Sequence, residues 1–170
     1  MDSPKLARLI AQGEGQATFE GRLVVHKIVV ALKPNSRIRV KFISARSRPR
    51  QCIDIFPRRC KHDLEWGGGV AKFDGGFWRC WFDTMPSDFD IVIVEAEENP
   101  ALSFQNGEEH PAAPDRRLSW GGNNGMNPVL SNDRKVLRVN CNGFDMKREP
   151  DFKDLIFEVH SEVPLEVSYE

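Results

Sequence analysis

The stretch Arg37-Ile38-Arg39-Val40-Lys41-Phe42 decides the fold class of this chain. Apolar residues alternate with cations at every step, and successive side chains of a β-strand point to opposite faces of the sheet. The stretch therefore predicts a strand that buries Ile38, Val40 and Phe42 on one face and presents three cations on the other.

The same period-two pattern recurs on both sides of this strand. Further strands are predicted over 17–32, 52–56, 70–73, 77–82, 89–96, 134–141, 155–160 and 165–169. The 17–32 segment is expected to be one long strand, or two strands with a kink near Gly21, at a sheet edge where it could pair with another chain. A short helix is predicted between Ser3 and Gly13. About eight strands joined by short turns predict an all-β fold, an antiparallel β-sandwich or jelly roll with one short N-terminal helix.

The segment 97–133 departs from this pattern. It holds four prolines, an Asn106-Gly107 pair and a Gly/Asn-rich run around Trp120. Long stretches of this composition are typical of loops. We therefore expect a long, partly mobile insertion loop over 97–133 within a single domain that spans 1–170.

Length and composition restrict the class of protein. The 170 residues are 40% hydrophobic, enough for a core, which excludes collagen-like and wholly disordered chains. No apolar run reaches the ~18 residues that a membrane-spanning helix needs. No apolar region follows Met1–Lys5, so a secretory signal is not predicted and a cytoplasmic location is expected. The four cysteines are expected to be free thiols.

The net charge of −1 hides an uneven distribution. Residues 33–61 carry ten basic side chains and one acidic side chain, whereas the other 141 residues carry 14 basic and 24 acidic ones. This block favours a surface that contacts an acidic partner. The alternative is a solvated sheet face whose cations are offset by acids elsewhere in the chain. The residues expected to bind the partner are Arg37, Arg39, Lys41, Arg46, Arg48, Arg50 and Trp120.

The sequence lacks the common catalytic motifs: it has no phosphate-binding loop, dinucleotide fingerprint, zinc-protease motif or nucleophile elbow. This favours a non-catalytic binding or assembly module without a cofactor over an enzyme. We expect a protein partner or a second copy of the chain, with a polyanion as the alternative. Two other functions stay open: a small metal- or cysteine-dependent hydrolase with a dispersed His/Cys site, and a carbohydrate-binding module that uses exposed tryptophans.

Weak candidates for metal ligands are Cys60, His62 and Cys80, although their spacing matches no common zinc motif. Asp83, Asp88 and Asp90 are a second cation candidate, for Ca²⁺. The aromatic residues between 66 and 82 are divided by strand parity. Phe77 and Trp81 are expected on one face, and Trp78 and Phe82 on the other.

Overall fold

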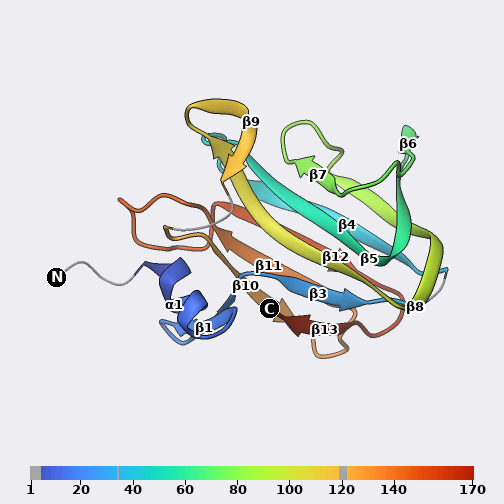
Figure 1. Cartoon of the computed structure of the whole chain (residues 1–170), viewed down its shortest axis with the longest axis horizontal. Coiled ribbons are helices and arrows are strands. Elements are labelled where there is room, and N and C mark those ends of the chain that lie inside the picture. The colour runs from blue at the N-terminus through green and yellow to red at the C-terminus, as the bar shows by residue number, and fades with distance from the viewer. Residues whose placement is uncertain (1–4, 34, 119–121) are drawn as a thin grey trace.

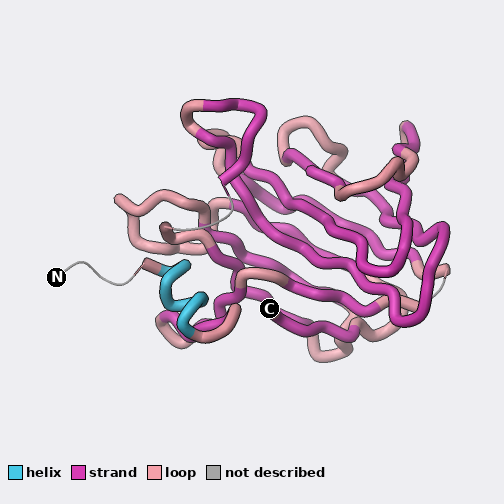
Figure 2. Tube along the Cα trace, viewed as in Figure 1, coloured by secondary structure: helices cyan, strands magenta, loops and turns pink. Residues whose placement is uncertain are grey.

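Thirteen antiparallel strands form one hydrogen-bonded sheet in the computed structural model, which describes residues 5–33, 35–118 and 122–170 (Figure 1). Strand dominates the chain, and loops gather mainly at the ends of the sheet (Figure 2). The elements are α1 (Leu6–Gln12), β1 (Gln16–Phe19), β2 (Arg22–Val25), β3 (Ile28–Ala31), β4 (Arg37–Ala45), β5 (Gln51–Trp66), β6 (Gly69–Ala71), β7 (Trp78–Trp81), β8 (Asp88–His110), β9 (Ala113–Leu118), β10 (Gly125–Leu130), β11 (Val136–Asn142), β12 (Leu155–His160) and β13 (Glu166–Tyr169).

The all-β class and the short N-terminal helix are confirmed. The strand arrangement differs from the expected eight-stranded sandwich, because the described strands belong to one sheet that curls until it is nearly closed as a barrel. Its main path runs β1-β2-β10-β11-β12-β4-β8-β3-β13, and β5 pairs with the other edge of β8. No described helix is long and apolar enough to cross a membrane.

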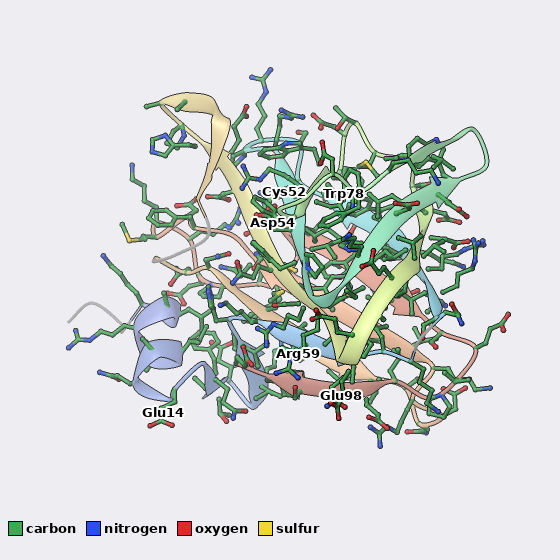
Figure 3. All side chains as sticks on the ribbon, turned by 45° about the vertical axis from the view of Figure 1, so that its right-hand side comes forward. Glu14, Cys52, Asp54, Arg59, Trp78 and Glu98 are labelled. Atoms are coloured by element: carbon green, nitrogen blue, oxygen red, sulfur yellow. The ribbon has the colours of Figure 1, made fainter. Side chains whose placement is uncertain are left out.

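The two long strands β5 and β8 run side by side and bend together (Figure 1). At the bend, Arg59 and Asn99 both adopt positive φ angles, 55° and 54°. The register also shifts, since Arg58 pairs with Ala101 and Cys60 with Ala96. Such an irregularity bends a strand without ending it. Figure 3 labels Arg59 and Glu98 at this bend. As a result, β8 pairs with β4 before the bend and with β3 after it.

The expectation of an insertion loop over 97–133 is wrong. β8 continues through His110, β9 folds back on it, and β10 begins at Gly125. The Asn106-Gly107 pair lies inside β8, opposite Ile53 and Cys52 of β5. Pairing along both edges of β8 supplies the backbone hydrogen bonds that a loop would have lacked.

The strand read from 37–42 is confirmed as the start of β4. Its three apolar side chains are buried, while Arg37 and Arg39 are exposed and Lys41 is half-buried. β4 lies between β12 and β8, and its inner face joins a core that extends through the curled sheet. Within that core the rings of Phe104 on β8 and Phe157 on β12 lie 6.2 Å apart.

The predicted edge strand over 17–32 is instead three strands. Glu20 and Gly21 both have positive φ and form the tight turn between β1 and β2. β3 is an interior strand that pairs with β8 and β13, so it is not available to another chain. α1 packs its buried residues Leu6 and Ile10 on a separate small cluster with Val24.

Candidate functional site

The outward face of β4 lies in register with acidic residues of both neighbouring strands. Lys41 pairs with Glu158 of β12 on one side and with Asp88 of β8 on the other. Arg39 lies between His160 and Asp90 in the same way. Directly opposite residues on one face are close enough to interact. This arrangement agrees with the alternative prediction of a solvated sheet face, because acidic residues on the neighbouring strands lie directly opposite the cations of β4.

Asp90 links the two arginines at the start of β4. Its Oδ2 accepts a hydrogen bond of 2.7 Å from Arg37, and its Oδ1 accepts one of 2.8 Å from Arg39. Arg37 also donates to Glu65 at 2.9 Å. The hydrogen bond from Arg39 keeps the pKa of Asp90 below its ordinary value, with Arg37 adding to the effect. The aspartate thus holds two guanidinium groups side by side.

These two arginines keep hydrogen-bonding capacity for a ligand. Both side chains are 53% exposed. Arg39 donates to Asp90 through Nε and Nη2, and its Nη1 has no acceptor among the described residues. A guanidinium has five N–H donors in a planar fork that suits carboxylates. The Arg37–Asp90–Arg39 triad therefore presents exposed N–H donors of a kind that can bind a carboxylate.

Two hollows meet at this triad. The larger, about 890 Å³, is lined by Arg37, Arg39 and Asp90 together with Lys33, Arg134 and an apolar wall. The smaller, about 440 Å³, is lined by the same three residues and by others that include Trp66. We call the two hollows together the arginine groove. It crosses β12, β4, β8 and β5, where His160, Arg39, Asp90 and Glu65 are successive partners. Three interstrand spacings amount to about 14 Å.

Six of the seven expected partner-binding residues lie in the described part of the chain, and these six do not share one surface. Arg46 directly follows the far end of β4, roughly 30 Å from Arg37 at the rise of a strand, and Arg50 lies in the loop beyond it. Both are paired there: Arg46 lies 2.9 Å from Asp151, and Arg50 donates to Asp83 at 2.6 and 2.7 Å. Lys41 lies midway along β4, and Arg48 is exposed in the loop. Trp120 lies outside the described residues.

Arg46 borders a buried polar network that the sequence reasoning missed. Asn106 donates to the Asn124 side chain at 2.8 Å and to the Asn142 carbonyl at 3.1 Å. Each of these asparagines precedes a glycine, and Asn-Gly pairs are typical of turns. The sequence therefore predicts three separate turns instead of one buried cluster. Burial raises the pKa of the adjacent Glu108. The network ties β8, β10 and β11 together at the end of the sheet opposite the arginine groove.

The weak metal candidates do not converge. Among the described residues, no group of three or more histidines, cysteines and carboxylates could hold a metal ion. Cys60 donates to the Ala101 carbonyl, and burial raises the pKa of both Cys60 and Cys80, which disfavours the thiolate. None of the four cysteines, all of them in the described part of the chain, forms a disulfide bond. The aspartates near 83–90 are engaged by arginines, Asp83 by Arg50 and Asp90 by the triad.

His62 occupies a closed apolar site rather than a ligand shell. Its ring stacks on Phe73 with centroids 5.3 Å apart and meets Trp78 edge-on at 6.4 Å. Neither ring nitrogen has a hydrogen-bond partner. Burial lowers the pKa of His62 from 6.5 to about 4, although Asp63 opposes the shift. The side chain is therefore a neutral core residue at neutral pH.

The aromatic residues divide as strand parity predicts. Trp78 and Phe82 pack against the main core. Phe77 is 40% exposed and stacks on Phe56 at 4.6 Å, while Arg50 covers the ring of Trp81. Figure 3 labels Trp78 on β7 and Cys52 and Asp54 on β5, and in the register of these two strands Trp78 lies opposite Ile55. Since internal contacts occupy the outer rings, this face is less open than an aromatic binding platform.

Sequence reasoning also missed most of the lining of the arginine groove. Arg134, Val163 and Leu165 come from turns 89 or more positions beyond the end of β4, and no local pattern links them to it. Comparison of the chain with family models, with curated proteins and with solved structures finds no match. The functional argument therefore rests on the groove itself.

Proposed function

We propose that this chain is a non-catalytic binding module that holds an acidic segment of a protein partner across the arginine groove. The observation that carries the proposal is the Arg37–Asp90–Arg39 triad, which presents two half-exposed guanidinium groups at the junction of two hollows. Lys33 and Arg134 add cations to the larger hollow. Concave sites of this size at the mouth of a curled sheet are common places for ligands.

The proposal narrows the surface expected from sequence. Arg37 and Arg39 remain in it, whereas the Arg46–Arg50 loop lies at the other end of β4 with its own carboxylate partners. One continuous sheet through the described residues also supports the proposal that 1–170 acts as a single domain.

The test compares two charge reversals, Arg39→Glu and Arg50→Glu. Both arginines pair with an aspartate, but only Arg39 lines the groove. The probe is a fluorescein-labelled hexaglutamate peptide, followed by fluorescence anisotropy at low salt. Loss of one charge-assisted contact of about 1.5–3 kcal/mol should weaken binding roughly 10-fold or more in Arg39→Glu. Arg50→Glu should bind within about twofold of the unchanged chain.

Binding should also weaken as salt is raised, because the groove is exposed. Melting curves followed by circular dichroism check that both variants are folded. A folded Arg39→Glu variant that binds hexaglutamate as well as the unchanged chain would contradict the proposal. So would a chain that does not bind the peptide at low salt.

Carbohydrate binding has one supporting observation, since Trp66 borders the smaller hollow. An indole face beside polar groups suits a sugar ring. A neutral oligosaccharide such as cellohexaose should then quench tryptophan fluorescence with little dependence on salt. A Trp66→Ala variant that keeps the full quench would reject this second candidate.

A further inference from the structure

We infer that the segment bound in the arginine groove is an amphipathic acidic peptide, in which an apolar residue lies within one or two positions of its carboxylates. The inference rests on the proposed function and specifies the chemistry of the partner. It comes from the contrast between the two walls of the larger hollow.

One wall of the larger hollow is apolar. Ile38 and Leu165 are nearly buried there, each 3% exposed, and Val163 is 53% exposed. Hydrogen bonds hold this wall in place: the Leu165 amide donates to the Arg134 carbonyl at 2.7 Å, and Arg134 donates to the Leu165 carbonyl at 3.0 Å. A fixed apolar wall with an exposed valine offers contact area to an apolar side chain of a ligand.

The apolar wall and the arginine triad are close enough for one short segment to contact both. His160 begins the groove on β12 beside the loop that carries Val163, and Arg39 is its direct partner on β4. Neighbouring strands lie about 4.8 Å apart, and an extended peptide advances about 3.3 Å per residue. Ile38 of the wall directly precedes Arg39 in β4 and lines the same hollow, so a ligand residue on this part of the wall and a carboxylate at Arg39 are one or two positions apart. The full groove, about 14 Å long, accommodates roughly four residues.

The acidic residues of the groove oppose a uniformly charged ligand. Asp90, Glu162 and Glu166 line the larger hollow, and Glu65 and Asp88 line the smaller one. A nucleic acid or sulfated polysaccharide carries an anion at every repeat, so some of its charges would face these carboxylates at a cost. A peptide can place its carboxylates at the arginines and an apolar or neutral residue elsewhere. The groove lining carries five carboxylates beside four lysine and arginine side chains, so a peptide whose few carboxylates are confined to the arginines fits it better than a densely charged ligand.

The experiment uses the full chain and three fluorescein-labelled peptides of equal length in a Gly/Ser background. The first has leucine beside two glutamates, the second has alanine in place of leucine, and the third has glutamines in place of the glutamates. The leucine–glutamate peptide should bind about 10-fold more tightly than the alanine peptide, as expected for burial of a leucine side chain. The glutamine peptide should bind at least 10-fold more weakly.

Two matched variants locate the apolar contact. Val163→Ser should remove most of the advantage of leucine over alanine, since Val163 lines the hollow. Val129→Ser should leave the advantage unchanged, because Val129 is equally exposed, at 51%, but does not line the groove. Both side chains are on the surface, so neither change is expected to unfold the chain.

The outcomes distinguish failure of the amphipathic-peptide inference from failure of the proposed function. Equal binding of the leucine and alanine peptides, with binding still lost in Arg39→Glu, overturns this inference and leaves the proposed function standing. Tighter binding of polyuridylate or heparin than of the leucine–glutamate peptide overturns it in favour of a polyanion. No binding of any acidic peptide overturns the proposed function as well.

Discussion

Replacing His62 with phenylalanine is expected to abolish a pH-dependent loss of stability of about 2.5 kcal/mol between pH 7.5 and pH 4.5. The histidine is fully buried, and neither ring nitrogen has a hydrogen-bond partner. Burial lowers its pKa from 6.5 to about 4 in the folded chain. In the unfolded chain the ring is in water and titrates near 6.5.

The direction of the effect follows from which state binds the proton. Between pH 6.5 and pH 4 the unfolded chain takes up a proton on His62 that the folded chain excludes. Stability is therefore unaffected above pH 6.5 and decreases as the pH falls through this window. The shift of ~2.5 units corresponds to about 3.4 kcal/mol in full, of which about 2.5 kcal/mol is lost by pH 4.5.

Urea unfolding at the two pH values measures this effect in the unchanged chain, in His62→Phe and in His62→Leu. The other titrating groups are common to all three, so the difference between their pH dependences isolates His62. His160→Phe is the matched control, because His160 is partly exposed and lies 2.9 Å from Glu158. The His160→Phe variant should still lose at least as much stability between pH 7.5 and pH 4.5 as the unchanged chain. If both His62 variants lose as much stability as the unchanged chain, then His62 is already protonated or hydrated in the fold, and the reasoning is refuted.

Three further changes test the packing. Phe157→Ala removes a fully buried ring and should cost about 3–5 kcal/mol in urea unfolding; a cost below about 1 kcal/mol would contradict its place in the core. Leu6→Ala should remove hydrogen-exchange protection from α1 while the sheet stays protected, because seven residues are too few for a helix without docking; loss of protection throughout the sheet would contradict this. Gly143→Ala places a methyl group against the Glu108 carboxylate and should cost about 1–3 kcal/mol, whereas Gly67→Ala, with open space around it, should change stability by less than about 0.5 kcal/mol; equal effects on thermal unfolding would reject the clash.

The buried face of individual strands was predictable from the sequence, because it depends only on the alternation of neighbouring residues. The alternation through Arg37–Phe42 determines which face of β4 is buried, and the same parity divides Trp78 and Phe82 from Phe77 and Trp81. These predictions hold because the pleat of a strand fixes side-chain direction whatever the strand pairs with.

The first part of β8 was predicted as the strand over 89–96, but its continuation to His110 was missed because the local signals there point to turns. Pro100 and the Asn106-Gly107 pair both indicate a break in regular structure. The strand persists because β5 pairs with it on both sides of the bend. Tertiary pairing here overrides local propensity, which a single sequence does not reveal.

Only part of the arginine groove was predictable from the sequence. Arg37 and Arg39 lie on one predicted strand, whereas the other lining residues come from distant segments of the chain. The arginines of β4 are adjacent in the sequence, but Asp90 is 51 positions from Arg39 and 53 from Arg37. The register between β4 and β8 decides which acid faces which cation. Local patterns fix neither that register nor the turn that carries Val163.

The sheet order also has a consequence for how the chain folds. β4 needs both β8 and β12, and β12 is among the last strands in the sequence. Other contacts are as distant, such as that of the Asn127 side chain with the Leu23 carbonyl, 104 positions away. Topologies of this kind fold slowly, in milliseconds to seconds. During that interval one edge of β4 is open, and charged side chains discourage such edges from pairing with other molecules. We therefore expect Arg37, Arg39 and Lys41 to disfavour aggregation of the unfinished sheet.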